Sequence, residues 1–268
     1  MDKKLIAIDL DGTTLNNNSE ITTETVNTLN KLMDLGHIVN IVTGRPPRLV
    51  TDIYNEIGLN DPLISFNGSL GFNPLGEWSK AYEYNIDKSI VFDILKHKDE
   101  IGVNLMAVEG KELFLANEEA KDTVGFFPTQ LEEHQIINEA NLTSNPVCLT
   151  LQIEPSKMND FMQYIKDNYE DELEISPWGG NDSIVELATK DISKKTGIKV
   201  LSDYYEIGRN NILAFGDEFN DESMLKYAGL GVAMKNGQPK IKALANDVTE
   251  YSNDENGLAK YLNHYFDL

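Results

Sequence analysis

Two carboxylates stand directly after an apolar segment near the start of the chain. Residues 5–14 read Leu-Ile-Ala-Ile-Asp-Leu-Asp-Gly-Thr-Thr, so Asp9 and Asp11 lie one residue apart at the end of a predicted buried strand. Alternate residues of a strand face the same side, and open α/β sheets bind ligands at the carboxyl ends of their strands. The pair is therefore a candidate site, although this segment alone also fits an ordinary Asp-Gly turn.

Two further apolar segments end in polar residues of the same kind. The segment 38–42 is followed by Thr43-Gly44-Arg45, and the segment 211–215 by Gly-Asp217-Glu-Phe-Asn220-Asp221. Parallel strands would bring the three endings to one edge of a sheet. We therefore expect these residues to form one site together with Asp9 and Asp11.

The acidic residues of this site suggest a metal. Asp217 and Asp221 are four residues apart, which places both carboxylates on one face of a helical turn. With Asp9 and Asp11 they form a group of oxygen ligands that needs a cation to remain ionised, and such hard donors suit Mg²⁺. For Asp217 and Asp221 alone, a helix N-terminal cap is the alternative.

Carboxylates beside Mg²⁺ can carry out phosphoryl transfer. One carboxylate can act as the nucleophile, while a second protonates the leaving alcohol and then deprotonates the attacking water. The charge on the phosphoryl group has to be offset by the metal, neutral donors and a cation. Thr43 and the Gly44 amide can supply the donors, and Lys194 or Lys195, after the predicted helix cap Ser193, can supply the cation.

Three polar residues near these motifs have more than one interpretation. Arg45 and its neighbour Arg48 follow Thr43, so either could contact substrate, and a helix-capping or surface role fits as well. Asn67 precedes Gly68 at the end of a short apolar run, where a left-handed turn position is favoured over a substrate contact.

Composition restricts the classes of partner. The 268 residues carry 23 Lys and Arg against 44 Asp and Glu, a net charge of -21. Such a field repels nucleic acids and anionic membranes, which argues against either as the partner. Cys148 is the only cysteine, so no disulfide forms within one chain, and a reducing cytoplasm is expected. The apolar run near the start of the chain, residues 5–8, is too short for a signal peptide.

The pattern of elements predicts an α/β protein with a discontinuous domain. Strands and helices alternate up to about residue 80 and again from residue 193, which is typical of a Rossmann-like parallel sheet. The middle of the chain is richer in adjacent antiparallel strands and reads as an α+β insertion, beginning with a predicted hairpin over 72–84. We therefore expect a core from residues 1–82 and 190–268, with an inserted domain over residues 83–189.

Taken in order, the motifs resemble those of the haloacid dehalogenase-like phosphatases. The resemblance spans the chain, and the size and position of the insertion are similar to the Cof-type branch with its large α/β cap. Gly237, after Lys-Asn, and Lys195 depart from the family pattern. The resemblance implies these roles: Asp9 as nucleophile, Asp11 as general acid and base, Thr43 and Lys194 as phosphoryl binders, Asn220 near the phosphate, and Mg²⁺ held by Asp9, the Asp11 carbonyl and Asp217 with support from Asp221.

The leading hypothesis is a Mg²⁺-dependent phosphatase that hydrolyses a small phosphorylated metabolite, such as a sugar phosphate, through an aspartyl-phosphate at Asp9. The inserted domain would close over the pocket and select the leaving group. A phosphotransferase or mutase would use the same core residues, and a noncatalytic sensor of phosphometabolites would keep the binding groups. A signalling receiver domain is disfavoured by the insertion and by the chain length.

Overall fold

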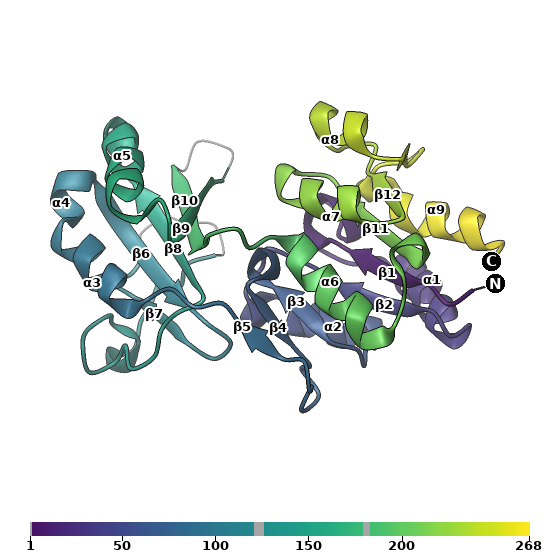
Figure 1. Ribbon diagram of the computed structural model, residues 1–268, viewed down its shortest axis with the longest axis horizontal. Helices are drawn as coiled ribbons and strands as arrows, with labels where there is room; N and C mark the ends of the chain where they lie inside the picture. Colours follow the sequence, from purple (N-terminus) through teal and green to yellow (C-terminus); the bar gives the residue numbers. More distant parts are fainter. Residues whose placement is uncertain (1, 121–125, 179–182) are drawn as a thin grey trace. The chain divides into compact units, whose positions relative to one another are not determined.

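The computed structural model describes residues 2–120, 126–178 and 183–268, and the chain divides into two compact units. The core unit joins the beginning of the chain, up to Tyr82, to its end from Ser193 to Leu268. The inserted unit is the continuous segment Glu83–Ile192. In Figure 1 the core unit therefore contains both the purple and the yellow ends of the chain.

The core unit is built on a five-stranded parallel sheet. Its strand order is β13-β12-β11-β1-β2, so the first strand lies in the middle, between strands from opposite ends of the sequence. Short apolar runs form these strands because both faces of the sheet are covered and the side chains are buried. Their bounds are β1 (Leu5–Ile8), β2 (Ile38–Ile41), β11 (Ile212–Gly216), β12 (Leu230–Ala233) and β13 (Asp247–Val248).

Helices cover both faces of this sheet. On one face, Leu5 and Ala7 pack with α6, α7 and α8. On the other face, the ring of Phe215 contacts Tyr261 of α9, and α1 packs beside α9. Adjacent strand residues thus face opposite layers, as the pleat requires. The helices are α1 (Thr23–Asp34), α2 (Thr51–Ile57), α6 (Lys194–Tyr205), α7 (Glu222–Tyr227), α8 (Pro239–Leu244) and α9 (Gly257–Phe266).

A smaller three-stranded sheet completes the core unit. It contains β3 (Leu63–Ser65), β4 (Leu70–Phe72) and β5 (Tyr82–Glu83), in that order. The predicted hairpin over 72–84 is present with shorter strands, because β4 and β5 are neighbours in this sheet and a bridge between Asn73 and Gly76 closes the turn after β4. β4 also pairs with β3 in an antiparallel manner, which the sequence did not predict. A parallel bridge between Val42 and Ile64 connects β3 to the end of β2.

The inserted unit has a five-stranded antiparallel sheet with helices on one face (Figure 1). Its strand order is β7-β6-β8-β10-β9, and a buried apolar cluster joins the sheet to α3 and α5. The strands are β6 (Val103–Glu109), β7 (Phe114–Ala116), β8 (Cys148–Ile153), β9 (Leu173–Pro177) and β10 (Ile184–Thr189), and the helices α3 (Lys88–Lys96), α4 (Lys98–Ile101) and α5 (Met158–Tyr169).

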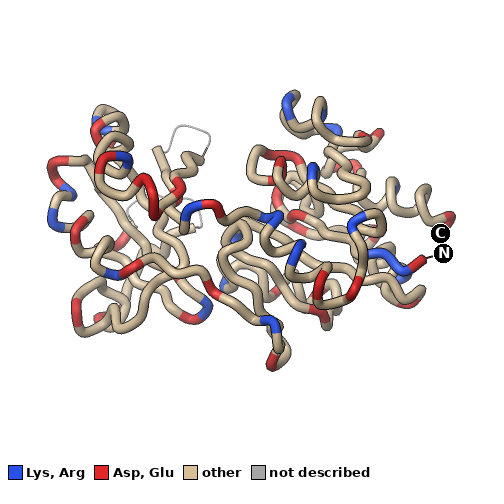
Figure 2. The backbone as a smooth tube through the Cα atoms, in the orientation of Figure 1, with Lys and Arg blue, Asp and Glu red and all other residues tan. Residues whose placement is uncertain are grey.

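These two architectures confirm the predicted fold class of a parallel Rossmann-like core with an inserted α+β domain. The chain returns to the core unit at Ser193 rather than at residue 190, because Lys190 donates its amide to Glu172 O and pairs with Glu174 in the inserted unit. Among the described residues, no helix is both long and apolar enough to cross a membrane. Acidic and basic residues are interspersed along both units (Figure 2).

Candidate active site

The carboxyl ends of three neighbouring parallel strands bring the predicted motifs together. β1 lies between β2 and β11, with Ile8 level with Ile41 and Phe215. Asp9 directly follows β1, and its amide donates to Phe215 O at 3.1 Å. Because the three strands run in the same direction, the segments that follow them meet at one edge of the sheet, as the sequence predicted.

Lys194 is the centre of the charged cluster at this edge. Its Nζ lies 2.6 Å from Asp9 Oδ1 and 2.6 Å from Asp221 Oδ1, and its side chain is fully buried. Burial opposes a charge on Lys194, but attraction to Asp221 and Asp9 prevails and raises the pKa of its ammonium above the ordinary value. The first residue of α6 thus connects the ends of β1 and β11, while Lys195 is exposed.

The loop after β11 holds the two remaining carboxylates of the cluster. Asp221 Oδ2 accepts the backbone amides of Asp217 and Glu218, at 2.9 and 3.1 Å, and Asp221 is fully buried. Asp217 Oδ1 accepts a hydrogen bond from Thr13 Oγ1 at 3.2 Å. Burial and the neighbouring Asp221 raise the pKa of Asp217 to about 7. The helix-capping interpretation of Asp221 is therefore compatible with its place in the cluster. Its Oδ2 caps the short turn Phe219–Asp221 by accepting the Glu218 amide, while its Oδ1 faces Lys194.

The donor set fits a hard divalent cation. Asp9, Asp217 and Asp221 each offer an oxygen, and these atoms lie within 4.8 Å of one another. Three carboxylates face a single ammonium, and burial raises the pKa of Asp9 well above its usual range although Lys194 opposes this. A cation would remove the cost of ionising these groups, and all-oxygen ligands suit Mg²⁺.

Asp11 lies apart from this cluster. It is exposed, on a turn over Leu10–Thr14 in which Gly12 has a φ of 68°. Both of its carboxylate oxygens accept hydrogen bonds from Arg45, with Nε to Oδ2 at 2.8 Å and Nη2 to Oδ1 at 2.6 Å. Both residues were candidates from the sequence, but their ion pair could not be predicted, because no local pattern links a strand end to a residue 34 positions away.

Thr43 and Gly44 form another side of the site. Thr43 is fully buried, and its Oγ1 accepts the Arg45 amide at 3.1 Å. Asn220 is exposed, and its Nδ2 donates to Asn67 Oδ1 at 3.0 Å. Asn67 has a φ of 53°, in agreement with the favoured turn interpretation, yet it also contacts the site. The sequence signal for it was the Asn-Gly pair after a short apolar run, which indicates a turn and nothing more.

Asn236 and Thr13, for which the sequence predicted no individual role, support the first motif. Asn236 Nδ2 donates to Gly12 O at 2.7 Å, and Asn236 Oδ1 in turn accepts the amide of Asn253 at 3.0 Å. Thr13, noted only as part of the motif, hydrogen-bonds to Asp217. Gly12 itself has no room for a side chain, since a Cβ there would lie 2.2 Å from Asp217 Oδ2. This explains why a glycine follows Asp11.

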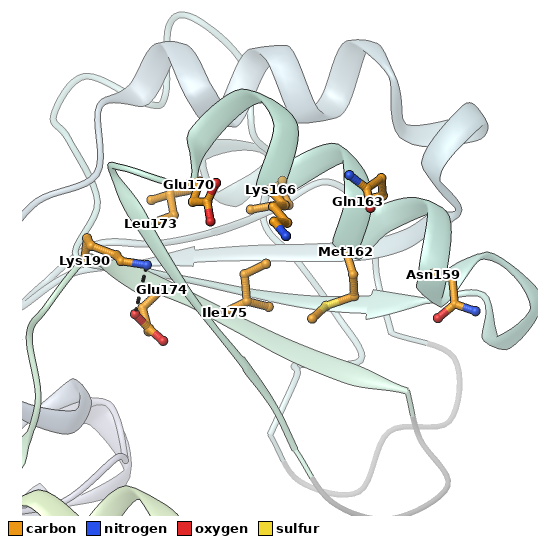
Figure 3. A pocket seen from close by; sticks show the side chains of 10 residues that line it. Asn159, Met162, Gln163, Lys166, Glu170, Leu173, Glu174, Ile175 and Lys190 are labelled. Atoms are coloured by element: carbon orange, nitrogen blue, oxygen red, sulfur yellow. Dashed lines mark ion pairs between the residues drawn. The ribbon is translucent and has the colours of Figure 1, made fainter.

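A separate pocket lies within the inserted unit, between α5 and β9 (Figure 3). Its lining includes Met162 and Lys166 of α5, Ile175 of β9, and the ion pair between Lys190 and Glu174. None of its lining residues belongs to the predicted motifs.

The chain is similar to proteins of a known family along nearly its whole length. A family model for haloacid dehalogenase-like hydrolases matches residues 6–262. The chain is 30% identical over 267 residues to the Bacillus subtilis (strain 168) protein 5-amino-6-(5-phospho-D-ribitylamino)uracil phosphatase YitU, with 98% of each protein covered.

Solved structures show the same fold across both units. A haloacid dehalogenase-like hydrolase from B. subtilis has a TM-score of 0.77 at 27% identity, covering 97% of this chain and 99% of the other. A sugar phosphatase of haloacid dehalogenase subclass IIB has a TM-score of 0.79 at 22% identity, covering 99% and 100%. The chain belongs to the haloacid dehalogenase-like hydrolase family, with the fold of its Cof-type, subclass IIB phosphatases.

Proposed function

We propose that this phosphatase hydrolyses a small phosphorylated metabolite, a sugar phosphate or similar phosphomonoester, through an aspartyl-phosphate on Asp9 and with Mg²⁺. The observation that carries the proposal is the buried cluster in which Lys194 holds both Asp9 and Asp221. The ion pairs of Lys226 with Glu222 and of Lys235 with Glu255 are at least partly exposed to solvent, whereas the pairs made by Lys194 are buried where three strand ends meet.

The proposed metal ligands are the carboxylates of Asp9 and Asp217 and the main-chain carbonyl of Asp11, with Asp221 in support. Mg²⁺ bound there would offset negative charge on the carboxylates and on the phosphoryl oxygens. Asp221 supports the loop through its hydrogen bonds to the amides of Asp217 and Glu218.

In the first proposed step, an Asp9 carboxylate oxygen bonds to phosphorus while the bond from phosphorus to the ester oxygen breaks. Lys194, Thr43 and the Gly44 amide bind phosphoryl oxygens, and Asp11 donates a proton to the departing alcohol oxygen. In the second step a water oxygen, whose proton passes to Asp11, attacks phosphorus and releases Asp9 and inorganic phosphate. Atoms and protons balance over the two steps, and the chain returns to its starting form.

Arg45 has a place in this sequence of steps because it occupies both oxygens of Asp11 in the present structure. Release of one of these hydrogen bonds would free an Asp11 oxygen for the proton transfer. A phosphorylated substrate offers Arg45 an alternative anionic partner. We therefore assign Arg45 to substrate binding, with release of Asp11 as the consequence.

The direct test is hydrolysis of a generic aryl phosphate with Mg²⁺, with and without EDTA. We expect metal-dependent turnover by the native chain, loss of turnover in Asp9→Asn, and native rates in Asp52→Asn, an exposed aspartate of α2 that serves as the matched control. A panel of sugar phosphates and the phosphoribitylamino-uracil substrate named for YitU would then identify the substrate class.

Three outcomes would contradict the proposal. Metal-dependent turnover that survives Asp9→Asn would exclude Asp9 as the nucleophile. Absence of turnover by the native chain on any phosphomonoester, with phosphate and Mg²⁺ still bound, would favour a sensor. Transfer of the phosphoryl group to an added alcohol in preference to water would indicate a phosphotransferase.

A further inference from the structure

A strained turn follows β3 in the core unit. Phe66, Asn67 and Gly68 are consecutive, and all three have a positive φ, of 48°, 53° and 102°. Asparagine and glycine tolerate this region, whereas phenylalanine seldom adopts it. Such strain persists only where the surrounding contacts impose the conformation, and it is concentrated at functional sites.

Asn67 contacts two of the segments that the proposed function assigns to the phosphoryl group. Its amide donates to Thr43 O at 3.0 Å, and its side-chain Oδ1 accepts from Asn220 Nδ2 at 3.0 Å. The side-chain amide of Asn67 also lies against the Cα of Gly44, because a Cβ added at Gly44 would be 3.0 Å from Asn67 Oδ1. Asn67 therefore explains why a glycine follows Thr43.

The next residue of the turn contacts the third segment. A Cβ on Gly68 would lie 2.1 Å from Ser193 O, so the backbone that begins α6 packs directly on the turn. That backbone leads into Lys194. One turn of three residues thus touches the ends of β2 and β11 and the start of α6, which carry Thr43, Asn220 and Lys194.

We propose that Asn67 is a positioning residue for the transferring phosphoryl group, acting through Asn220. The inference rests on the proposed function of this site. Asn220 is exposed and would otherwise rotate freely. Asn67 Oδ1 takes one hydrogen of the Asn220 amide, which fixes the amide plane and leaves the other hydrogen for a phosphoryl oxygen. Fixing this group before the substrate binds removes an entropic cost of binding.

The experiment measures binding of inorganic phosphate in the presence of Mg²⁺ by titration calorimetry, which needs no turnover. Asn67→Gly keeps the left-handed backbone and removes the amide, and Asn220→Ala removes its partner. Each variant should bind phosphate about tenfold more weakly, the loss expected for one hydrogen bond. The double variant should lose about tenfold and no more, because the two amides act as one unit.

Asn256→Gly is the matched control. Asn256 has nearly the same φ, 59°, but its side chain bonds to Thr22 and Glu24. This control should bind phosphate with native affinity. Mg²⁺ affinity, measured without phosphate, should be unchanged in Asn67→Gly, which distinguishes loss of phosphoryl positioning from general damage to the site.

Native phosphate affinity in Asn67→Gly would overturn the inference, and so would a hundredfold loss in the double variant, since independent effects multiply. Hydrolysis is assayed separately on the same samples. Failure of the native chain to hydrolyse any phosphomonoester would contradict the proposed function, while the pattern of phosphate affinities would still decide the role of Asn67.

Discussion

The Lys194 side chain stabilises the core unit and, in the proposed mechanism, binds the phosphoryl group. It is fully buried and lies 2.6 Å from a carboxylate of each of two strand-end segments. Removing one partner of a buried ion pair leaves an uncompensated buried charge. The resulting loss of folding free energy is larger than the net stability that the intact pair contributes. The same position places its ammonium where the proposed phosphoryl group would bind.

Lys194→Met and Lys195→Met form a matched pair of variants. We expect Lys194→Met to reduce the free energy of unfolding by about 3–5 kcal/mol in metal-free buffer, because Asp9 and Asp221 remain buried without their cation. Lys195 is exposed, so its variant should stay within about 0.5 kcal/mol of the native chain. Denaturant unfolding measures both. Equal free energies of unfolding for the two variants would contradict the assigned role of Lys194.

The residue types at the site could be predicted from the sequence, but their pairings could not. Asp9, Asp217 and Lys194 stand at strand ends or at a helix start, and such positions can be recognised locally. The pair formed by Asp11 and Arg45 and the contact of Asn67 depend on how loops far apart in the chain fold against each other. An Asn-Gly turn has the same sequence signal whether or not it contacts a site.

At the level of elements, glycines mark the places where segments approach closely. Gly68 combines a φ of 102° with a backbone contact to Ser193, and Gly12 lies against Asp217. A side chain at either position would separate the turns that align the site. The junction between the turn after β3 and the start of α6 is therefore under strict steric constraint.

Gly68→Ala should destabilise the core unit and lower activity together. Its positive φ and the contact at Ser193 O both penalise a Cβ, and we expect a loss of about 1–3 kcal/mol in the free energy of unfolding. Gly208 has a φ of -65° and open space around its Cα, so Gly208→Ala should be neutral or slightly stabilising. Thermal unfolding and phosphatase assays of both variants check this, and a neutral Gly68→Ala would be inconsistent with the packing.

Most elements of the core unit followed from apolar runs and helix boundaries, because a buried parallel strand is a continuous apolar segment. The segment 72–84 was predicted as a hairpin from its Asn-Pro-Leu-Gly turn, and β4 does pair with β5. The pairing of β4 with β3 could not be predicted, because tertiary contacts choose the second partner of a short strand.

For the whole molecule, the charge balance makes stability depend on pH and metal. The pKa of Asp217 is raised from its ordinary value of 3.8 to about 7 in the metal-free chain. The folded chain therefore binds a proton more tightly than the unfolded chain, and this group makes stability fall as pH rises from about 4 to 7. A bound cation would reverse this effect.

We expect Mg²⁺ to raise the unfolding temperature more at pH 7.5 than at pH 5. At a free Mg²⁺ concentration of a hundred times the dissociation constant, binding would raise the free energy of unfolding by about 2.7 kcal/mol. Asp217→Asn is the control, because it should remove both the dependence on pH due to this group and most of the Mg²⁺ effect. A Mg²⁺ effect that is equal at the two pH values, or unchanged in Asp217→Asn, would contradict the ligand assignment.

In the proposed mechanism, Asp9 carries the phosphoryl group during turnover. Acid quenching of the chain during hydrolysis of an aryl phosphate, followed by peptide mass spectrometry, measures this directly. We expect a hydroxylamine-sensitive phosphoryl group on Asp9, which accumulates further in Asp11→Asn because release to water is slowed. Steady turnover with Asp9 unmodified in both proteins, or a phosphoryl group on another residue, would exclude an aspartyl-phosphate at Asp9.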